Sequence, residues 1–197
     1  SEQGLTVSQA LRTPAFYYLM LAGAITGSSF GVWSVHLVPH LTSVGYSAQM
    51  AGAFLGIFGA VSLGNRLLIG FLADRLGRRN LYIATFLFLA GGLFIFANLR
   101  PERLWLLFIY FPIHTAGIAG FSILGQSVIA DYFGTRRLGS IRGLSGILHM
   151  PLGVGLPVLA GWIFDQTGTY YLAFSMMSGI CASGVIWVLL AGKPRAF

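Results

Sequence analysis

The sequence GFLADRLGRR occupies positions 70–79, between two apolar stretches that are each long enough to cross a membrane. Gly70 lets neighbouring helices approach closely, and Asp74 places a negative charge where the first stretch ends. Gly77 allows the positive backbone angle φ that a tight turn needs. The turn also carries three arginines: Arg75, Arg78 and Arg79. These cations suit a loop near anionic lipid head groups, so the segment predicts a short polar turn between two transmembrane helices.

Six apolar runs of about 20 residues, the length that crosses a hydrocarbon core about 30 Å thick, follow one another along the chain. The connectors between them are short and contain Pro, Gly or Asp, so no second domain fits. The predicted spans lie near 15–38, 50–73, 80–99, 104–130, 141–164 and 170–191. We therefore expect an all-α integral membrane protein with six transmembrane helices in one unit, 1–197.

The composition excludes ordinary soluble proteins. Hydrophobic residues make up 56% of the chain and charged residues 9%, whereas soluble domains carry about a quarter charged residues. The net charge of +7 does not indicate a nucleic-acid partner, because the basic residues flank apolar runs. The single cysteine, Cys181, allows neither an intrachain disulfide nor a thiolate metal site. We expect a lipid bilayer as the surroundings, with no cofactor and no metal.

Basic residues sort to one side of the predicted membrane. An even number of spans places both termini on the same side, while the opposite loops receive Arg100 and Arg103. The side with the termini receives Arg12, Arg75, Arg78, Arg79, Arg136, Arg137, Arg142, Lys193 and Arg195. By the positive-inside rule, we expect a multi-pass protein of the plasma membrane with both termini in the cytoplasm.

The two halves of the chain share the pattern Gly-x-x-x-Asp-x-x-Gly. One constant offset aligns Asp74 with Asp165 and also aligns three glycines around each of them. We expect repeat units at about 12–99 and 103–191. Each unit holds three spans, so the second copy crosses the membrane with inverted topology, which is typical of secondary transporters.

The segment 70–79 resembles the signature loop of the major facilitator superfamily (MFS) in motif, in position after the second span and in its predicted cytoplasmic side. The resemblance implies that Asp74 faces the positive N-terminus of a helix in an opposite six-helix half. It also implies that the arginines pair with an acid at the end of the fourth span, where Asp131 stands. These residues would form a latch that closes the cytoplasmic side, consistent with helix-dipole energetics. The latch residues are Gly70, Asp74, Arg75, Gly77, Arg78, Arg79 and Asp131.

Members of the superfamily have twelve spans, so the chain corresponds to one half, and it begins without an initiator methionine. The stretches 5–14 and 161–170 resemble the lead-in to the seventh helix and the exit from the eleventh. The chain is therefore identified as a C-terminal half that is similar to the monocarboxylate and oxalate:formate branch. This implies alternating-access transport of a small organic anion such as a mono- or dicarboxylate, by symport with a proton or by exchange with a second anion. The missing half would come from the same chain, or from a second copy if the chain is naturally complete.

Arg66 lies inside the second span, about 12 Å from its cytoplasmic end at a rise of about 1.5 Å per residue. A charge at that depth costs at least ~2.5 kcal/mol, and the acids of the chain all lie at span ends or beyond. One interpretation is that Arg66 extends toward Asp74 or Asp131, or pairs with an acid of the missing half. The other is that a substrate carboxylate supplies the anion, held by the planar guanidinium.

Two histidines are further candidates for substrate binding. His149 lies about 10 Å into the fifth span and so shares a depth with Arg66. In the oxalate:formate branch the matching position carries lysine, and histidine at this position is either a weaker anion ligand, a proton site or a packing residue. His114 lies near the midplane of the fourth span, beside Pro112, where Tyr110, Ser122 and Gln126 either line the same cavity or pack. We assign no chemistry to His36 and His40.

Two other classes of function stay open. A six-span receptor or scaffold without a transport cycle fits the same spans. An intramembrane serine protease of the rhomboid kind is suggested by GLSG at 143–146, but the sixth span holds no histidine to activate Ser145, so we do not expect an enzyme. Glycines of the second and fifth spans suit close helix crossings: Gly52, Gly56, Gly59, Gly153, Gly155 and Gly161.

Overall fold

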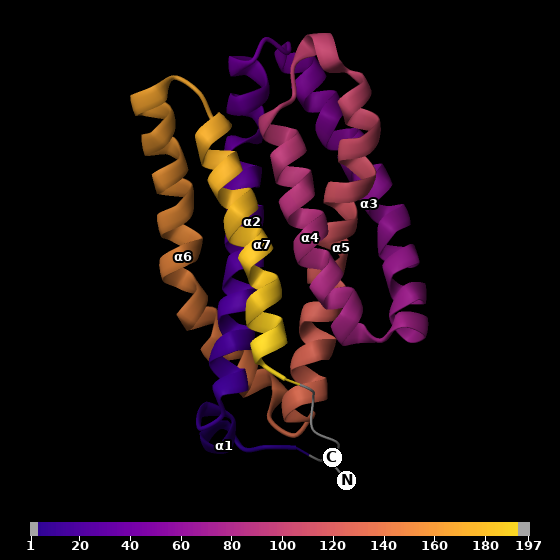
Figure 1. Cartoon of the computed structure of the whole chain (residues 1–197), viewed down its shortest axis with the longest axis vertical. Helices are drawn as coiled ribbons and strands as arrows, with labels where there is room; N and C mark the ends of the chain where they lie inside the picture. The colour runs from indigo at the N-terminus through magenta and orange to yellow at the C-terminus, as the bar shows by residue number, and fades with distance from the viewer. Residues whose placement is uncertain (1–3, 193–197) are drawn as a thin grey trace.

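The computed structural model describes residues 4–192, apart from the side chain of Leu148, so Lys193 and Arg195 lie outside the described residues. Six long helices run side by side, as the sequence predicts (Figure 1). They are α2 (Pro14–Ser43), α3 (Ala48–Leu76), α4 (Arg78–Ala97), α5 (Trp105–Phe133), α6 (Leu138–Thr167) and α7 (Tyr171–Leu190). Two short elements accompany them, α1 (Val7–Leu11) and the 3₁₀ turn η1 (Pro101–Arg103).

Helix ends follow local chemistry. Pro14 opens α2, where its missing N–H costs nothing, and the Ser47 side chain accepts a hydrogen bond from the Met50 N–H to cap α3. The short helix α1, which we did not predict, begins with a capping box formed by Thr6 and Gln9. Gly168 ends α6 with a φ of +69°, a left-handed conformation that glycine adopts without strain.

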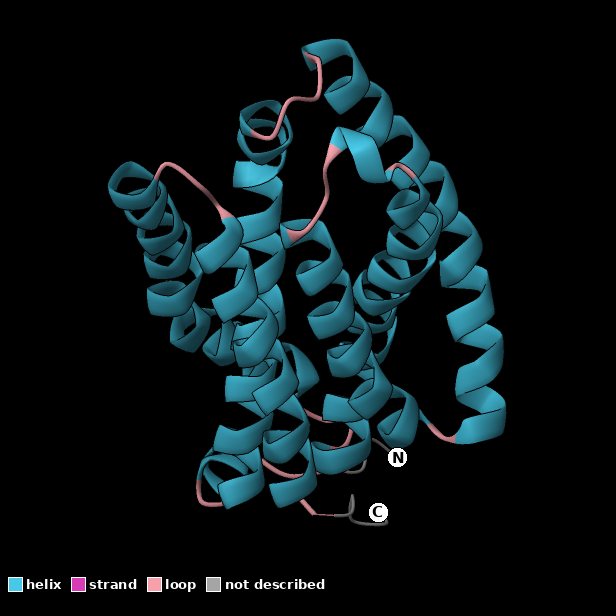
Figure 2. Ribbon diagram, turned by 45° about the horizontal axis from the view of Figure 1, so that its top comes forward, coloured by secondary structure: helices cyan, strands magenta, loops and turns pink. Residues whose placement is uncertain are grey.

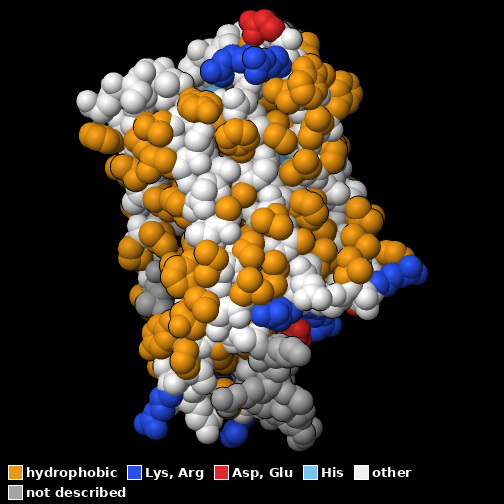
Figure 3. Space-filling model, in the orientation of Figure 1, with side chains coloured by type: hydrophobic (Ala, Val, Ile, Leu, Met, Phe, Trp, Pro, Cys, Tyr) orange, Lys and Arg blue, Asp and Glu red, His pale blue; other side chains and the backbone are white. Residues whose placement is uncertain are grey.

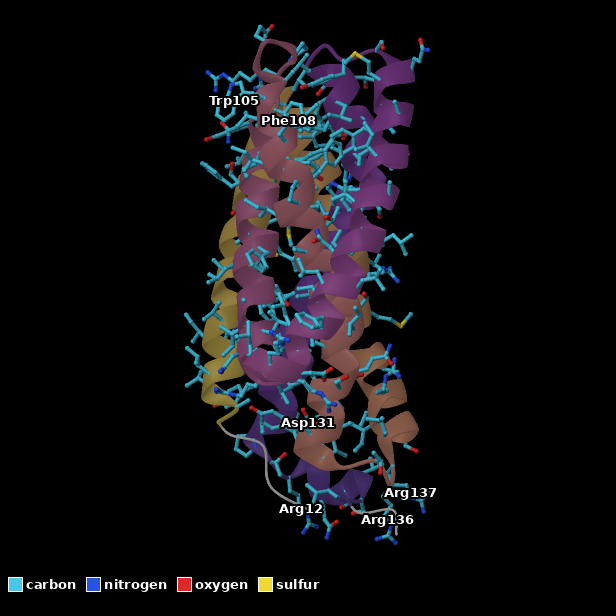
Figure 4. All side chains as sticks on the ribbon, turned by 90° about the vertical axis from the view of Figure 1, so that its right-hand side faces the viewer. Arg12, Trp105, Phe108, Asp131, Arg136 and Arg137 are labelled. Atoms are coloured by element: carbon cyan, nitrogen blue, oxygen red, sulfur yellow. The ribbon has the colours of Figure 1, made fainter. Side chains whose placement is uncertain are left out.

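The six long helices are each long and apolar enough to span a membrane. Loops lie at the two ends of the bundle (Figure 2), and on the face shown in Figure 3 charged side chains gather at these ends, with an apolar belt between them. One end, called the basic end below, carries the α3–α4 and α5–α6 turns and the beginning of α2. Figure 4 places Arg12, Arg136 and Arg137 there, and Trp105 at the opposite end.

Helix packing leaves α3 and α6 at the two edges of the bundle (Figure 1). In the interior, α4 packs against α5 and α7, while α2 packs against α7 and α6 and α5 packs against α3. When α2, α3 and α4 are exchanged with α5, α6 and α7, respectively, the same packing pairs are obtained. The inverted repeat itself stays a prediction, which this packing favours. Helices α3 and α6 expose most of their surface, although both are strongly apolar.

Within the bundle, the closest helix crossings lie at glycines other than the predicted ones. A Cβ added at Gly120 would overlap Thr85 of α4, and one at Gly184 would overlap Phe86. By contrast, an added Cβ would meet nothing within 4 Å at five of the predicted positions, Gly52, Gly56, Gly59, Gly153 and Gly155. These five lie on the outward faces of α3 and α6, so close crossings at them stay a prediction, for contacts with helices outside this six-helix unit.

Candidate functional site

The turn between α3 and α4 has the backbone that its sequence predicts. Gly77 separates the two helices with a φ of +82°, which other residues adopt with strain. Asp74 is exposed near the end of α3. The guanidinium carbon of Arg75 lies 4.2 Å from the centre of the Phe71 ring, a cation–π contact. The Asp74 carboxylate therefore stays accessible at the basic end.

The expected contact between this turn and the end of α5 is present. Nη1 of Arg78 donates to Oδ1 of Asp131 at 3.1 Å, the one salt bridge found within residues 4–192. The two side chains are 49% and 34% exposed, so water screens the pair, and such pairs contribute about 0–1 kcal/mol. The bond joins α4 to α5 at the basic end, where Figure 4 shows Asp131.

Arg79 makes a second connection, to α7. Its Nε donates to the Tyr132 hydroxyl at 3.1 Å, and its Nη2 donates to the Val188 carbonyl at 3.2 Å. Carbonyls in the last turn of a helix lack intrahelical donors and carry partial negative charge. The Tyr132 hydroxyl in turn donates to the Gly192 carbonyl. Arg79 thus holds the ends of α4, α5 and α7 together.

Arg66 is exposed on α3. Its neighbour Asn65 fixes the orientation of the helix, because Nδ2 of Asn65 donates to the Pro112 carbonyl at 2.9 Å and to the Thr115 hydroxyl at 2.6 Å on α5. The next residue points about 100° away around the helix. Among the described residues no hydrogen bond or salt bridge of the Arg66 guanidinium is found, so it pairs with neither Asp74 nor Asp131.

His149 lines a cavity of about 650 Å³ between α2, α5 and α6. Its ring lies against Gly23 of α2, and its Nε2 is buried without a hydrogen-bond partner among the described residues. Ser122 and Gln126 of α5 line the same cavity, whereas Arg66 does not. Within this unit, the structure therefore does not bring Arg66 and His149 together.

Arg142 lines this cavity as well. Its Nη1 donates to Oε1 of Gln126 on α5 at 3.1 Å, and its carbonyl accepts from the Ser145 hydroxyl at 2.7 Å. Arg142, Ser145 and His149 recur at the i, i+3, i+7 spacing that places side chains on one helix face. The sequence groups Arg142 with the loop cations. In the structure α6 begins at Leu138, before the predicted start at 141, so Arg142 lies within the helix; its spacing to Ser145 and His149 is the signal that could have identified it.

His114 is enclosed by aromatic side chains. It is 1% exposed and stacks on Tyr110 with ring centres 5.2 Å apart, while Trp33 and Phe58 lie against its other sides. Neither ring nitrogen has a partner among the described residues. The Trp33 indole donates to the Tyr110 hydroxyl at 2.7 Å. No described cavity reaches the ring, so the structure does not place His114 with His149.

The other histidines bond helices together. Nε2 of His36 lies 2.9 Å from the Pro157 carbonyl, which can accept but not donate, so Nδ1 accepts from the Tyr170 hydroxyl at 3.2 Å. Burial, and then the nearby Asp165 carboxylate, raises the pKa of Tyr170, which keeps that donor protonated. Nε2 of His40 lies 2.8 Å from the Phe96 carbonyl. All three contacts join α2 to its neighbours.

The sequence profile of the Major Facilitator Superfamily matches residues 19–196, most of the chain. The chain belongs to the Major Facilitator Superfamily. The match agrees with six spans as half of an MFS fold, and it places the chain in a family of transporters rather than of enzymes. Ser145, 5% exposed, bonds to the backbone as described above.

Similar MFS proteins include several monocarboxylate transporters. Monocarboxylate transporter 12-B of Danio rerio is 29% identical over 167 residues, which cover 80% of this chain and 34% of the relative. Monocarboxylate transporter 11 of Homo sapiens is 28% identical over 198 residues, covering 92% and 40%. An uncharacterised MFS-type transporter of Bacillus subtilis, YcxA, is 26% identical over 161 residues, covering 79% and 39%. The chain spans about a third of the length of the first of these relatives.

Proposed function

We propose that the chain is the C-terminal six-helix half of a secondary active transporter, which moves a small organic anion such as a mono- or dicarboxylate by alternating access. The observation that carries the proposal is Arg66, a guanidinium inside a span, exposed on α3 and without a partner among the described residues. The names of the monocarboxylate transporters above support the substrate class.

The charge of Arg66 needs an anion. Its position ten residues before the end of α3 corresponds to about 15 Å along the helix, well within an apolar span. A guanidinium there costs at least ~2.5 kcal/mol when it faces lipid. A water-filled cavity, bounded by a second half, removes this cost and supplies substrate carboxylates. Planar bidentate hydrogen bonding then favours arginine over lysine.

The exposed faces of α3 and α6 support a second six-helix unit as the partner. These two helices bury the smallest share of their surface in the bundle, and their outward glycines meet nothing within this chain. Small residues let helices approach closely in lipid. The second unit comes from the same polypeptide or from a second copy, and rocking of one unit against the other opens the site to either side.

His149 and His114 are secondary candidates for the substrate path. His149 lines the cavity between α2, α5 and α6, and an imidazole can bind an anion or carry a proton. His114 lies in a closed aromatic cluster, so its participation requires α5 to move. A coupled proton or an exchanged anion would complete the cycle.

The contacts of the basic end favour a conformational role for the latch residues. Asp74 is free to meet a helix N-terminus of the second unit, while Arg78 and Arg79 join α4 to α5 and α7. We propose that this end faces the cytoplasm, in the plasma membrane, with both termini on that side. A cysteine at Leu76 should then be shielded from an impermeant reagent in intact cells, and one at Thr167 should react.

Transport by the full-length protein that carries this chain tests the proposal. In proteoliposomes loaded with unlabelled pyruvate, we expect counterflow of radiolabelled pyruvate or lactate that exceeds the uptake of choline. Arg66→Ala should abolish it. A correctly folded protein that moves no carboxylate, and whose behaviour does not depend on Arg66, would instead be a receptor or scaffold.

A further inference from the structure

The cavity between α2, α5 and α6 combines one cation with an apolar wall. We propose that Arg142 binds the carboxylate of a small monocarboxylate in this cavity, as a station near the basic end that is separate from Arg66. The inference rests on the proposed function and adds a residue and a place to it. Arg142 lies four residues after the start of α6, so it is about 6 Å along the helix.

The Arg142 guanidinium is exposed and pairs with no carboxylate among the described residues. Its partner is the Gln126 amide oxygen at 3.1 Å, which orients the group without neutralising it. The residues that line the cavity, all within the described part of the chain, include no Asp or Glu. A guanidinium carries five N–H donors, and one bond to Gln126 leaves donors for both oxygens of a carboxylate.

Glycines create the space for a ligand. Gly139, Gly143 and Gly146 line the cavity from α6, and an added Cβ at any of them would meet nothing within 4 Å. Gly23 and Gly125 line it from α2 and α5. A volume of about 650 Å³ lies within the usual range for small-molecule pockets, about 300–1,000 Å³.

The rest of the lining favours a carboxylate with an apolar body. Leu19 and Met20 of α2 and Phe121, Val128 and Ile129 of α5 contribute aliphatic and aromatic surface. His149 lies on the same face of α6, about 10 Å deeper than Arg142. If the ligand were a dicarboxylate, its second carboxylate would lie beside the apolar wall, where it would lose hydration without gaining a cation. The cavity therefore fits a monocarboxylate that binds first at Arg142 and then moves inward toward His149.

Replacing Gln126 by glutamate tests the charge directly. The full-length protein in neutral-lipid nanodiscs is titrated with radiolabelled 4-methyl-2-oxopentanoate, and its uncharged methyl ester serves as the control ligand. Gln126→Glu adds a carboxylate that competes for the Arg142 donors with little change in shape, so Kd should rise about tenfold, the loss of one charge-assisted contact. Gln126→Ala frees the guanidinium but keeps its charge, and should raise Kd by about threefold or less. Unchanged binding by Gln126→Glu would overturn the proposal.

A matched pair of glycine variants tests the volume. Gly146→Leu fills the cavity, whereas Gly179→Leu adds the same side chain at an exposed position of α7, where an added Cβ also meets nothing within 4 Å. Both changes favour helix formation, so both variants should fold. Binding should be clearly weaker in Gly146→Leu and unchanged in Gly179→Leu. Equal affinity in the two variants would place the ligand elsewhere.

Flux measurements separate this proposal from the proposed function. If the protein transports monocarboxylates and depends on Arg66, but Gln126→Glu and Gly146→Leu bind normally, the Arg142 station is wrong and the transporter stands. If the Gln126 and Gly146 variants lose binding while the parent shows no counterflow, the station stands and transport is wrong. A parent protein that does not bind the probe would overturn the station.

Discussion

Arg78 and Arg142 both lie at the basic end of the bundle, yet their guanidiniums meet different partners. Arg78 bonds to the Asp131 carboxylate at 3.1 Å, which cancels its charge and joins α4 to α5. Arg142 bonds to the Gln126 amide at the same distance, which holds the group in place and leaves it positive. The bonding partner therefore distinguishes the two arginines: Arg78 joins helices, whereas Arg142 can bind an anion.

The difference predicts opposite effects of removing the two side chains. Arg142→Ala should raise the Kd for a monocarboxylate about tenfold to a hundredfold, because one or two charge-assisted hydrogen bonds are lost. Arg78→Ala should change it by a few-fold at most, through the populations of the two states. Equilibrium binding in nanodiscs measures both, with size exclusion as the folding control. A larger loss in Arg78→Ala would reverse the assignment.

A second prediction contrasts the packed and the open glycines. Gly120→Ala should destabilise the protein by about 1–3 kcal/mol, since the new methyl group overlaps Thr85 and overpacking has this cost. Gly146→Ala should be neutral or slightly stabilising, because alanine favours helix and the site is open. Thermal unfolding in detergent compares them. Equal destabilisation by both changes would mean that α6 packs more closely than described.

A third and smaller effect concerns the salt bridge itself. Asp131→Asn should lower the free energy of unfolding by less than about 1 kcal/mol, because the pair is half-exposed. It should nevertheless change the exchange rate several-fold by shifting the conformational equilibrium, as should Asp74→Asn, with affinity largely kept. Exchange and binding are measured on the same variants. A loss of substrate affinity, rather than a change in exchange rate alone, would mean that these residues bind the substrate.

The fold was predictable because its signals are local. Length and apolarity give the six spans, and Gly77, Gly134 and Gly168 mark turns where φ is positive. The turn from α3 to α4 and the pairing of Asp131 were also predictable, from the motif and its resemblance to a known loop. The bounds moved by a few residues, since helix ends depend on caps rather than on hydropathy.

The cavity was not predictable, because it depends on which helices pack. The predicted start of the fifth span at 141 left Arg142 at its edge, whereas α6 begins at Leu138 and carries Arg142 on the same face as His149. Tertiary packing likewise decides which residue lies against a glycine. The sequence therefore does not show that Gly120 lies against another helix whereas Gly52 faces outward. Tyr132, which links Arg79 to the end of the chain's last helix, had no signal beyond its place beside Asp131.

Binding of a carboxylate to Arg66 variants tests the central claim most directly. In the full-length protein, Arg66→Lys keeps the charge but loses the planar pair of donors, so we expect weaker binding of radiolabelled pyruvate. Arg66→Ala should weaken binding further, with normal elution on size exclusion. If Arg66→Ala folds normally and binds and exchanges the substrate as tightly and as fast as the parent, Arg66 has a structural role and the account of anion transport is contradicted.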